Sequence, residues 1–295
     1  MRREEFYLID ASIYIFRSYF ALPDNWHSEE GWPTNAVQGY ASWLLTLLEK
    51  RQPQYLAAAH DESLGSGFRH QTYPDYKANR ALPDEALEFQ LNACRELADL
   101  LGIAHFASSS HEADDIIGTL AEQGRNEGFS PVILSRDKDL AQLLQPGELM
   151  WDFPNNEPKG LEQLQAEFGV QLSQLADYLA LTGDAIDNIP GVPGIGPKTA
   201  AAILQSFASI DDIFANTDQL SALPIRGAAS LADKLAPYKE QLQITRQLTT
   251  IRCDAPLEFD TQQLQWKGID YPAFESFCQQ IGLARQLLVR AAKLL

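Results

Sequence analysis

The sequence predicts an α/β core built on a largely parallel sheet, followed by a smaller helical lobe. In the first half of the 295 residues, short apolar runs alternate with longer amphipathic stretches. From about Leu161 onward the pattern is helical throughout, interrupted by a Gly/Pro-rich turn at Pro190–Pro197. Short apolar strands separated by helices are typical of a parallel sheet covered on both faces. We expect a core at 1–160, a lobe at 161–260 and a C-terminal extension without an assigned role at 261–295.

The individual elements follow from the spacing of apolar residues. Strands are predicted at Phe6–Asp10, Tyr55–His60, Ile103–Phe106 and Pro131–Leu134. Helices are predicted from the end of the first strand through Phe20 and at Val37–Lys50, Asp84–Leu101 and Glu112–Asn126. The last stretch, Ile281–Leu295, has the pattern of a basic amphipathic helix, which we expect to pack on the core.

Composition places the chain among globular proteins of a reducing compartment. Hydrophobic residues make up 45% of the sequence, enough for a sizeable core. No apolar run reaches the ~20 residues that cross a bilayer, and the first residues lack the apolar stretch of a signal peptide. Cys94, Cys253 and Cys278 are widely separated and form no CxxC motif, which argues against a disulfide framework or a zinc cluster. We therefore expect a cytoplasmic protein without a membrane partner.

The formal net charge of −17 argues against nucleic-acid binding when it is taken alone. Proteins that bind nucleic acid usually present a basic face, because contacts to phosphates dominate their affinity. The charge by itself favours a metabolic enzyme or a protein partner. Net charge is a global sum, however, whereas a binding face is local, and a carboxylate-lined metal site would account for several of the acids.

Acidic residues collect where the predicted strands end. Ligands of open parallel sheets bind beyond the carboxyl ends of the strands, so these side chains are expected to converge there. Two further acids, Asp184 and Asp187, are spaced one helical turn apart just before the Gly/Pro-rich turn. The acids at or after the strand ends are Asp10, Asp61, Glu112, Asp114, Asp115, Asp137 and Asp139.

Each of these acids also has a purely structural interpretation. An aspartate at a strand end is often a helix N-cap, and Ser109 with Glu112 fits a capping box. The whole set is harder to explain in this way, because so many like charges would repel one another unless divalent cations neutralised them. Ligation by oxygen alone favours Mg²⁺, or Mn²⁺, over zinc or copper. Two such ions about 4 Å apart are a recurring arrangement for phosphodiester hydrolysis.

The segment Phe68–Arg80 is basic and aromatic within an otherwise acidic chain. Cations that bind phosphates beside aromatic rings that stack on bases are typical of single-strand recognition. A solvated surface loop whose tyrosines pack into the core fits the segment equally well. Its position after the strand that ends at Asp61 favours the functional interpretation. The cations and tyrosines concerned are Arg69, Tyr73, Tyr76, Lys77 and Arg80.

The glycine- and proline-rich turn permits two functional interpretations. Gly191 and Gly196 have the spacing of a P-loop, but Pro197 stands where a P-loop requires lysine, and the preceding Leu172–Leu181 is helical instead of a strand. The alternative is a helix–hairpin–helix, in which backbone N–H groups at a helix N-terminus hold a DNA phosphate without reading sequence. We favour the second. The residues predicted to contact DNA there are Gly191, Gly194, Gly196, Lys198 and Thr199.

Five blocks of the chain together resemble the 5′→3′ exonuclease/flap endonuclease family, which includes the N-terminal nuclease domain of bacterial DNA polymerase I. The blocks are FYLIDASIYIFRSYFA, FRHQTYPDYKANR, EADDIIGTLA, LSRDKDLAQLL and TGDAIDNIPGVPGIGPKTA, in that order between about residues 6 and 255. The resemblance implies a PIN-like core, a helical arch at about 68–100 and a helix–three-turn–helix lobe. No polymerase domain follows, so we expect a stand-alone member.

The resemblance also implies roles for individual residues. It assigns Asp10, Asp61, Glu112, Asp114 and Asp137 mainly to the catalytic metal group, and Asp115, Asp139, Asp184 and Asp187 to the remaining carboxylates. Lys77 and Arg80 correspond to arch residues that stabilise charge on the scissile phosphate, Tyr76 to an arch aromatic that stacks on terminal bases, and Arg17 to a basic residue near the active site. Backbone carbonyls around Leu181, Thr182, Pro190, Val192 and Ile195 correspond to a K⁺ site.

The expected activity is Mg²⁺-dependent hydrolysis of DNA phosphodiesters near a free 5′ end, in primer removal and DNA repair. The expected partners are DNA with a free 5′ end, a 5′ flap or an RNA primer–DNA hybrid, bound by a monomer. Three other classes remain open. A non-catalytic DNA-junction binder should lack some of the acids, and a PIN-type ribonuclease should lack the hairpin at Gly191–Lys198. A phosphatase acting on small substrates leaves Phe68–Arg80 unexplained.

Overall fold

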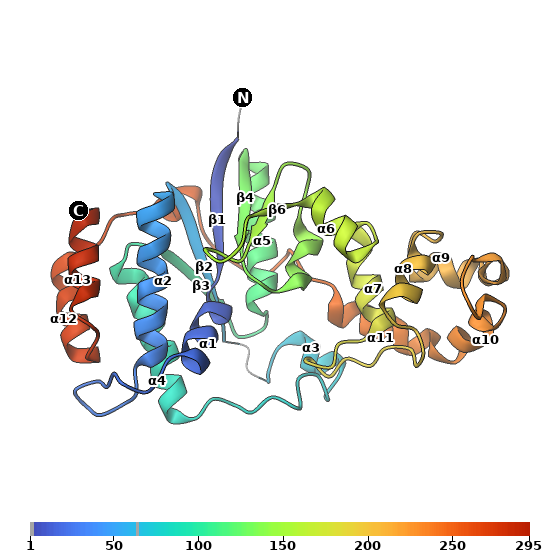
Figure 1. The fold of residues 1–295 in the computed structure, drawn as a ribbon, viewed down its shortest axis with the longest axis horizontal. Helices are drawn as coiled ribbons and strands as arrows, with labels where there is room; N and C mark the ends of the chain where they lie inside the picture. Colours follow the sequence, from blue (N-terminus) through green and yellow to red (C-terminus); the bar gives the residue numbers. More distant parts are fainter. Residues whose placement is uncertain (1–2, 63–64) are drawn as a thin grey trace.

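The core is a six-stranded, mostly parallel sheet, as the sequence predicts. The computed structural model describes residues 3–62 and 65–295. The strand order is β3-β2-β1-β4-β5-β6, parallel except that β6 runs antiparallel to β5 (Figure 1). The strands are β1 (Glu4–Asp10), β2 (Tyr55–Asp61), β3 (Ala104–Ser108), β4 (Phe129–Leu134), β5 (Leu149–Trp151) and β6 (Lys159–Gly160).

Helices cover both faces of the sheet because its strands carry apolar side chains on both faces. On β1, Tyr7 and Ile9 pack in one hydrophobic cluster, and Phe6 and Leu8 pack in another. The first cluster joins α1 (Ala11–Ala21), α2 (Asn35–Arg51), α4 (Glu85–Leu100), α12 (Tyr271–Ile281) and α13 (Gln286–Ala291) to the sheet. The second joins α5 (Ala113–Asn126) and the 3₁₀ helix η1 (Lys138–Leu143).

The helical lobe extends from one side of the core and has a hydrophobic cluster of its own (Figure 1). Its α-helices are α6 (Leu161–Phe168), α7 (Leu175–Thr182), α8 (Pro197–Leu204), α9 (Ile210–Ala215), α10 (Leu231–Leu235) and α11 (Lys239–Thr249). Its 3₁₀ helices are η2 (Leu172–Gln174), η3 (Thr217–Ala222), η4 (Ala228–Ser230) and η5 (Ala236–Tyr238). Helix α11 returns against α7 and against α3 (Phe68–Thr72), so it ties the lobe to the core.

The C-terminal residues pack on the core as expected, but they form two helices instead of one. Gly282 ends α12 with a left-handed φ of 70°, and a Cβ at this position would overlap the carbonyl of His27. Helix α13 then lies on α2, where the guanidinium of Arg290 contacts Glu49 at 2.8 Å. The remaining 3₁₀ turns are η6 (Thr261–Leu264) and η7 (Ala292–Leu294). Among the helices that the structure describes, none combines the length and hydropathy that crossing a bilayer requires.

Candidate active site

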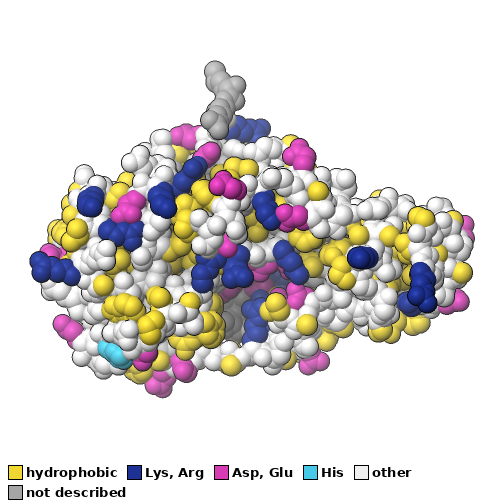
Figure 2. All heavy atoms as spheres, in the orientation of Figure 1, with side chains coloured by type: hydrophobic (Ala, Val, Ile, Leu, Met, Phe, Trp, Pro, Cys, Tyr) yellow, Lys and Arg dark blue, Asp and Glu magenta, His cyan; other side chains and the backbone are white. Residues whose placement is uncertain are grey.

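A pocket of about 600 Å³ opens at the carboxyl edge of the sheet. Its carboxylates are Asp10, Asp61, Glu112, Asp114, Asp137, Asp139 and Asp187, and its cations are Arg17, Lys77, Arg80 and Arg136. Figure 2 shows acidic side chains recessed in a hollow near the middle of the molecule, with lysine and arginine side chains around its rim. The pocket brings together acids that follow the strands β1 to β4, between residues 10 and 139, and Asp187 from the loop after α7.

Several of these carboxylates also serve the local fold. Asp10 accepts a hydrogen bond from the backbone N–H of Ile13 at 3.4 Å and so caps α1, and it accepts another from Ser135 Oγ at 2.6 Å. Asp61 accepts from the N–H of Ala113 at 2.8 Å, and Asp137 caps η1. A role as helix cap and a role in the pocket are thus compatible, because capping fixes each side chain at the mouth of the pocket.

Burial, and to a lesser extent mutual repulsion, disfavours the ionised form of the carboxylates in the free protein. Burial raises the pKa of Asp10 to about 7, and the charges of Asp61 and Asp137 add to this rise. Burial and Asp137 likewise raise the pKa of Asp139 to about 7. Asp139 Oδ1 is buried without a hydrogen-bond partner among the described residues. Such a set is stabilised when a cation replaces the protons.

The donor set fits a hard divalent cation held by oxygen. The pocket offers carboxylate oxygens, and none of the described residues that line it carries a thiol or an imidazole. Within the described part of the chain, no three acidic, histidine or cysteine side chains already stand in an arrangement that encloses one ion. Binding would therefore require rotation of some side chains. The residues best placed to hold the cation are Asp10, Asp61, Asp114, Asp137 and Asp139.

The raised pKa of Asp10 predicts an unusual dependence of stability on pH. The pKa of Asp10 is about 7 in the folded state, against roughly 4 for an unfolded aspartate. Its protonation therefore favours the folded state below about pH 4, and this contribution is lost as the pH rises through 7. In EDTA, the urea midpoint should fall as the pH rises from about 4 to about 7, and Asp10→Asn should reduce the fall. An identical pH dependence in both proteins would contradict the assignment.

The segment after α3 is held over the pocket by its own cations. Lys77 Nζ lies 2.7 Å from Glu112 Oε1, and the backbone N–H of Lys77 donates to the carbonyl of Asp187 at 2.9 Å. Arg80 forms an ion pair with Asp187. Lys77 has a left-handed φ of 54°, a conformation that bends the chain toward the carboxylates.

Tyr76 is buried, which does not fit its expected role of stacking on bases. The ring is 3% exposed, and its hydroxyl donates to Glu112 at 3.0 Å and to Asp187 at 3.3 Å. A ring buried in this way has no free face for a base, so the stacking role is corrected to one of anchoring the segment. Tyr73 packs partly buried beside Tyr76, and its contact with DNA stays a prediction.

The structure also corrects the roles of Arg69 and Asp115. Both are buried, and their side chains form a two-pronged ion pair at 2.6 and 2.9 Å. Arg69 also donates to the carbonyls of Leu248 and Thr250, and Asp115 accepts from the N–H of Arg252. Arg69 therefore does not face DNA, and the carboxylate of Asp115 is not free for a metal. Together they join α3 and α5 to the end of α11.

Because this ion pair is buried, removing one partner should cost much stability. Asp115→Ala should lower the free energy of unfolding by about 3 kcal/mol or more, since it leaves the Arg69 charge without compensation. The measurement is urea unfolding with and without Mg²⁺. Asp254→Ala, which removes the acid of the exposed Arg252–Asp254 pair, is the matched control and should cost less than about 1 kcal/mol. A loss for Asp115→Ala that appeared only with Mg²⁺ would restore its metal role.

Asp184 and Asp187 do not share a helical face. Helix α7 ends at Thr182, and Gly183 then takes a φ of 75°. Asp184 and Ile189 pair through backbone hydrogen bonds of 2.9 and 2.7 Å and close a short loop. Asp187 lines the pocket from this loop. Asp184 stabilises the loop itself, because its carboxylate accepts a hydrogen bond from the N–H of Ile186. Asp184 does not line the pocket, but its charge helps to raise the pKa of Asp139, so its metal role stays a prediction.

The hairpin has the close backbone packing that its glycines imply. A Cβ on Gly191 would overlap the carbonyl of Thr182, so this contact requires glycine. Gly194 has a φ of 78°, and α8 then begins with Pro197. Lys198 and Thr199 lie in the first turn of α8, and their contact with DNA stays a prediction.

The carbonyls named for K⁺ gather around the same contact between α7 and the hairpin. Some of them already accept hydrogen bonds from within the lobe. The carbonyl of Leu181 accepts from the N–H of Val192, that of Val192 accepts from Ile195, and that of Pro190 accepts from Gln241. Potassium binding at these carbonyls and that of Thr182 stays a prediction.

Three features of the site were missed from the sequence. Arg136 lines the pocket directly after β4. Phe16 and Phe20 line it from α1, and the i, i+4 spacing on that helix was the available signal. Lys234 of α10 extends to the hairpin, where its Nζ lies 3.2 Å from the position that a Cβ of Gly194 would take.

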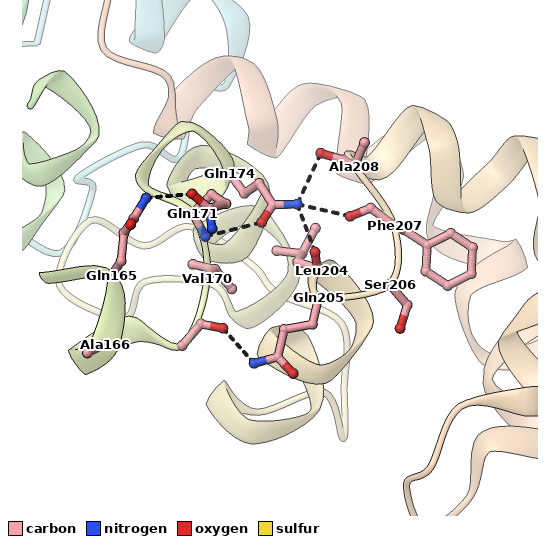
Figure 3. Close-up of a pocket in the computed structure, with 11 residues that line it drawn as sticks. Gln165, Ala166, Val170, Gln171, Gln174, Leu204, Gln205, Ser206, Phe207 and Ala208 are labelled. Atoms are coloured by element: carbon pink, nitrogen blue, oxygen red, sulfur yellow. Dashed lines mark hydrogen bonds between the residues drawn. The ribbon is translucent and has the colours of Figure 1, made fainter. Parts of the chain in front are cut away.

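A second cavity, of about 620 Å³, lies in the lobe between α6, η2 and the end of α8 (Figure 3). Glutamines dominate its polar lining, and their amides are already bonded within the lobe. Gln174 donates to the carbonyls of Leu204 and Phe207 at 2.8 and 2.9 Å, and Gln205 donates to that of Gly169. These bonds close the C-terminal end of α8. None of the predicted site residues lines this cavity.

The fold and the pocket together place a cluster of carboxylates at the carboxyl edge of a parallel sheet, beside a helical lobe. The sequence matches the family models of the 5′-3′ exonuclease N-terminal resolvase-like domain over residues 5–169 and of the 5′-3′ exonuclease C-terminal SAM fold over residues 170–272. The chain therefore belongs to the 5′-3′ exonuclease family and is a nuclease. The predicted family resemblance is confirmed.

Known proteins agree with this assignment. The chain is 34% identical to a 5′-3′ exonuclease of Aquifex aeolicus, over 94% of this chain and 92% of that protein. It is also 34% identical to DNA polymerase I of Bacillus subtilis, but it spans 31% of that protein's length. Its fold is similar to that of the T5 D15 flap endonuclease in a complex with DNA and metal ions, with a TM-score of 0.65, 20% identity and 99% of both chains covered.

Proposed function

We propose that the protein is a Mg²⁺-dependent, structure-specific 5′ nuclease that hydrolyses DNA phosphodiesters near a free 5′ end or flap junction. The observation that carries the proposal is the pocket itself, in which seven carboxylates from the core and the lobe face four cations. Carboxylates suit divalent cations, and cations at the rim suit a phosphate. The products are a 5′-phosphate and a 3′-hydroxyl.

The chain's own residues have separable tasks in this reaction. Mg²⁺, or Mn²⁺ in its place, would be held by Asp10, Asp61, Asp114, Asp137 and Asp139, and when bound supplies Lewis acidity at water and at a phosphate oxygen. Lys77 and Arg80 exchange their carboxylate partners for the scissile phosphate and stabilise its developing charge. The apolar face of α1, with Phe16 and Phe20, excludes water from one side of the pocket.

The lobe supplies recognition of shape instead of sequence. Helix α8 follows the Gly/Pro-rich hairpin, and its N–H groups with Lys198 can hold a phosphate of duplex DNA. Substrates with a free 5′ end, a 5′ flap or an RNA primer–DNA hybrid fit this arrangement. We place a monomeric protein of this kind in the cytoplasm, in primer removal and DNA repair, with K⁺ at the hairpin carbonyls.

A cleavage assay tests this proposal directly. A 5′-labelled DNA flap and a matching blunt duplex are incubated with the protein in Mg²⁺ and in EDTA. We expect release of short 5′-labelled products in Mg²⁺ alone, and the ratio between the two substrates measures the preference for flaps. Cleavage in EDTA would refute metal dependence. A retained gel shift without cleavage would replace the nuclease by a junction-binding protein.

A further inference from the structure

We propose that Arg136 is a substrate-binding residue, which holds a phosphate of the DNA on the β4 side of the carboxylate pocket. This inference rests on the proposed function, because it names a contact to the substrate of that same site. Arg136 follows β4 by two residues, is exposed, and lines the pocket. An arginine in this position presents a planar set of donors that matches phosphate oxygens.

Arg136 differs from the other three cations of the pocket, which all form ion pairs. Three of the four cations that line the pocket are engaged with carboxylates. Throughout residues 3–62 and 65–295, by contrast, the structure gives Arg136 no ion pair and no side-chain hydrogen bond. A phosphate can therefore bind Arg136 without first breaking an ion pair within the protein. The engaged pairs are Arg17–Asp152, Lys77–Glu112 and Arg80–Asp187.

Hydrogen bonds hold the residues on either side of Arg136 in place. Ser135 is buried, donates to Asp10 at 2.6 Å and accepts from the N–H of Asp137 at 2.9 Å. Asp137 in turn accepts from the N–H of Asp139 at 3.0 Å as it caps η1. Ser135 and Asp137 are thus tied to the first strand and to the start of η1. Arg136 projects from this rigid turn into the mouth of the pocket.

The strand order places Arg136 across the pocket from Lys77. In the sheet, β4 lies on one side of β1, and β2 and β3 lie on the other. Lys77 is held by Glu112, which follows β3, whereas Arg136 follows β4. A DNA strand crossing the pocket would meet one cation on each side of Asp10. Two contacts of this kind would fix which phosphate lies over the carboxylates, even in a chain of net charge −17.

An exposed cation with no internal partner should act on binding more than on the rate of the chemical step. A contact made equally in the bound substrate and in the transition state changes KM and leaves kcat nearly unchanged. Each phosphate contact also adds about one to the slope of log Kd against log salt concentration. These two signatures separate substrate binding from a merely structural role.

The test compares Arg136→Ala, Arg136→Lys and a control, Lys267→Ala. Lys267 is also exposed, but it lies near the amino end of β3, where its N–H donates to the carbonyl of Gly102. Binding of a labelled DNA flap is measured by anisotropy in EDTA from about 50 to 300 mM KCl, and kcat and KM are measured in Mg²⁺. For Arg136→Ala we expect affinity to fall roughly tenfold or less, the salt slope to fall by about one, and kcat to stay within about twofold. Arg136→Lys should keep the slope, and Lys267→Ala should match the unmodified protein.

An unchanged salt slope in Arg136→Ala, a slope equally lowered in Lys267→Ala, or a loss confined to kcat would overturn the proposal. Absence of flap binding by the unmodified protein in EDTA would overturn it as well. Failure of the nuclease proposal is separate, because it appears as missing cleavage by the unmodified protein while the binding isotherms still report the Arg136 contact.

Discussion

Asp114→Asn is expected to abolish cleavage, with a loss of about 1000-fold or more, while the protein stays folded and keeps its affinity for duplex DNA. Asp114 lies in the first turn of α5, and its side chain receives no hydrogen bond among the described residues. Burial, with Asp137 and Asp10 nearby, raises the pKa of Asp114 well above its usual range. Its ionised form therefore destabilises the free protein, and asparagine removes that repulsion at nearly constant shape.

The expected signature is that activity and stability change in opposite directions. At pH 8 in EDTA, the Tm of Asp114→Asn should equal or exceed that of the unmodified protein, and stabilisation by Mg²⁺ should be reduced. Asp99→Asn, at an exposed position where the carboxylate contacts His105, is the matched control and should keep full activity. Undiminished turnover by Asp114→Asn would remove this residue from the metal site. A lower Tm in EDTA would show that its charge supports the fold.

The core strands were predictable because each one leaves a local pattern. The predicted strands ending at Asp10 and Leu134 match β1 and β4 to within two residues, since a strand buried on both faces is a continuous apolar run. By contrast, β5 has three residues and β6 has two, which is too short for any periodicity. The helical spacing assumed for Asp184 and Asp187 was wrong, because Gly183 ends α7 just before them.

The position of the pocket could be predicted from the topology of the sheet. The errors in the predicted roles of its residues come from the geometry of the helix. Parallel strands present their carboxyl ends at one edge, so acids after several strands must converge whatever their sequence separation. Asp114 and Asp115, however, are consecutive on α5 and diverge by about 100°. Asp114 reaches the pocket, while Asp115 points to Arg69. The partner of Asp115 lies 46 residues away, so no local pattern could separate the two roles.

Charge distribution resolves the apparent conflict between an acidic chain and a DNA substrate. Seven carboxylates are concentrated in one pocket, where cations would neutralise them, and four lysine or arginine side chains stand among them. The pocket itself therefore carries a net charge of only −3, and most of the −17 of the chain lies elsewhere. Affinity for DNA then depends on which of the four cations are free, because paired cations must first leave a carboxylate.

Lys77→Met should lower kcat roughly 100-fold or more while changing affinity for the flap far less. Lys77 Nζ lies 2.7 Å from Glu112 Oε1 and 3.9 Å from Asp187 Oδ2, so in the free protein its charge is already compensated. The exchange of these partners for a phosphate therefore yields little net binding energy. The phosphate gains negative charge in the transition state, and there the ammonium interacts more strongly than with the ground state. The measurement is single-turnover cleavage together with anisotropy in EDTA.

Methionine is an unbranched side chain only one atom shorter than lysine, and the cost of the left-handed backbone at this position stays the same, so charge is the main change. Glu112 remains compensated, because Arg69 Nη1 lies 3.4 Å from it and Tyr76 donates to it. The fold should therefore survive, which a Tm within a few degrees of the unmodified protein would verify. Lys267→Met is the matched control and should keep both constants. A loss of affinity with kcat nearly unchanged would assign Lys77 to plain phosphate binding, the behaviour we expect of Arg136. The two variants together separate the cation that acts on the transition state from the one that holds the strand.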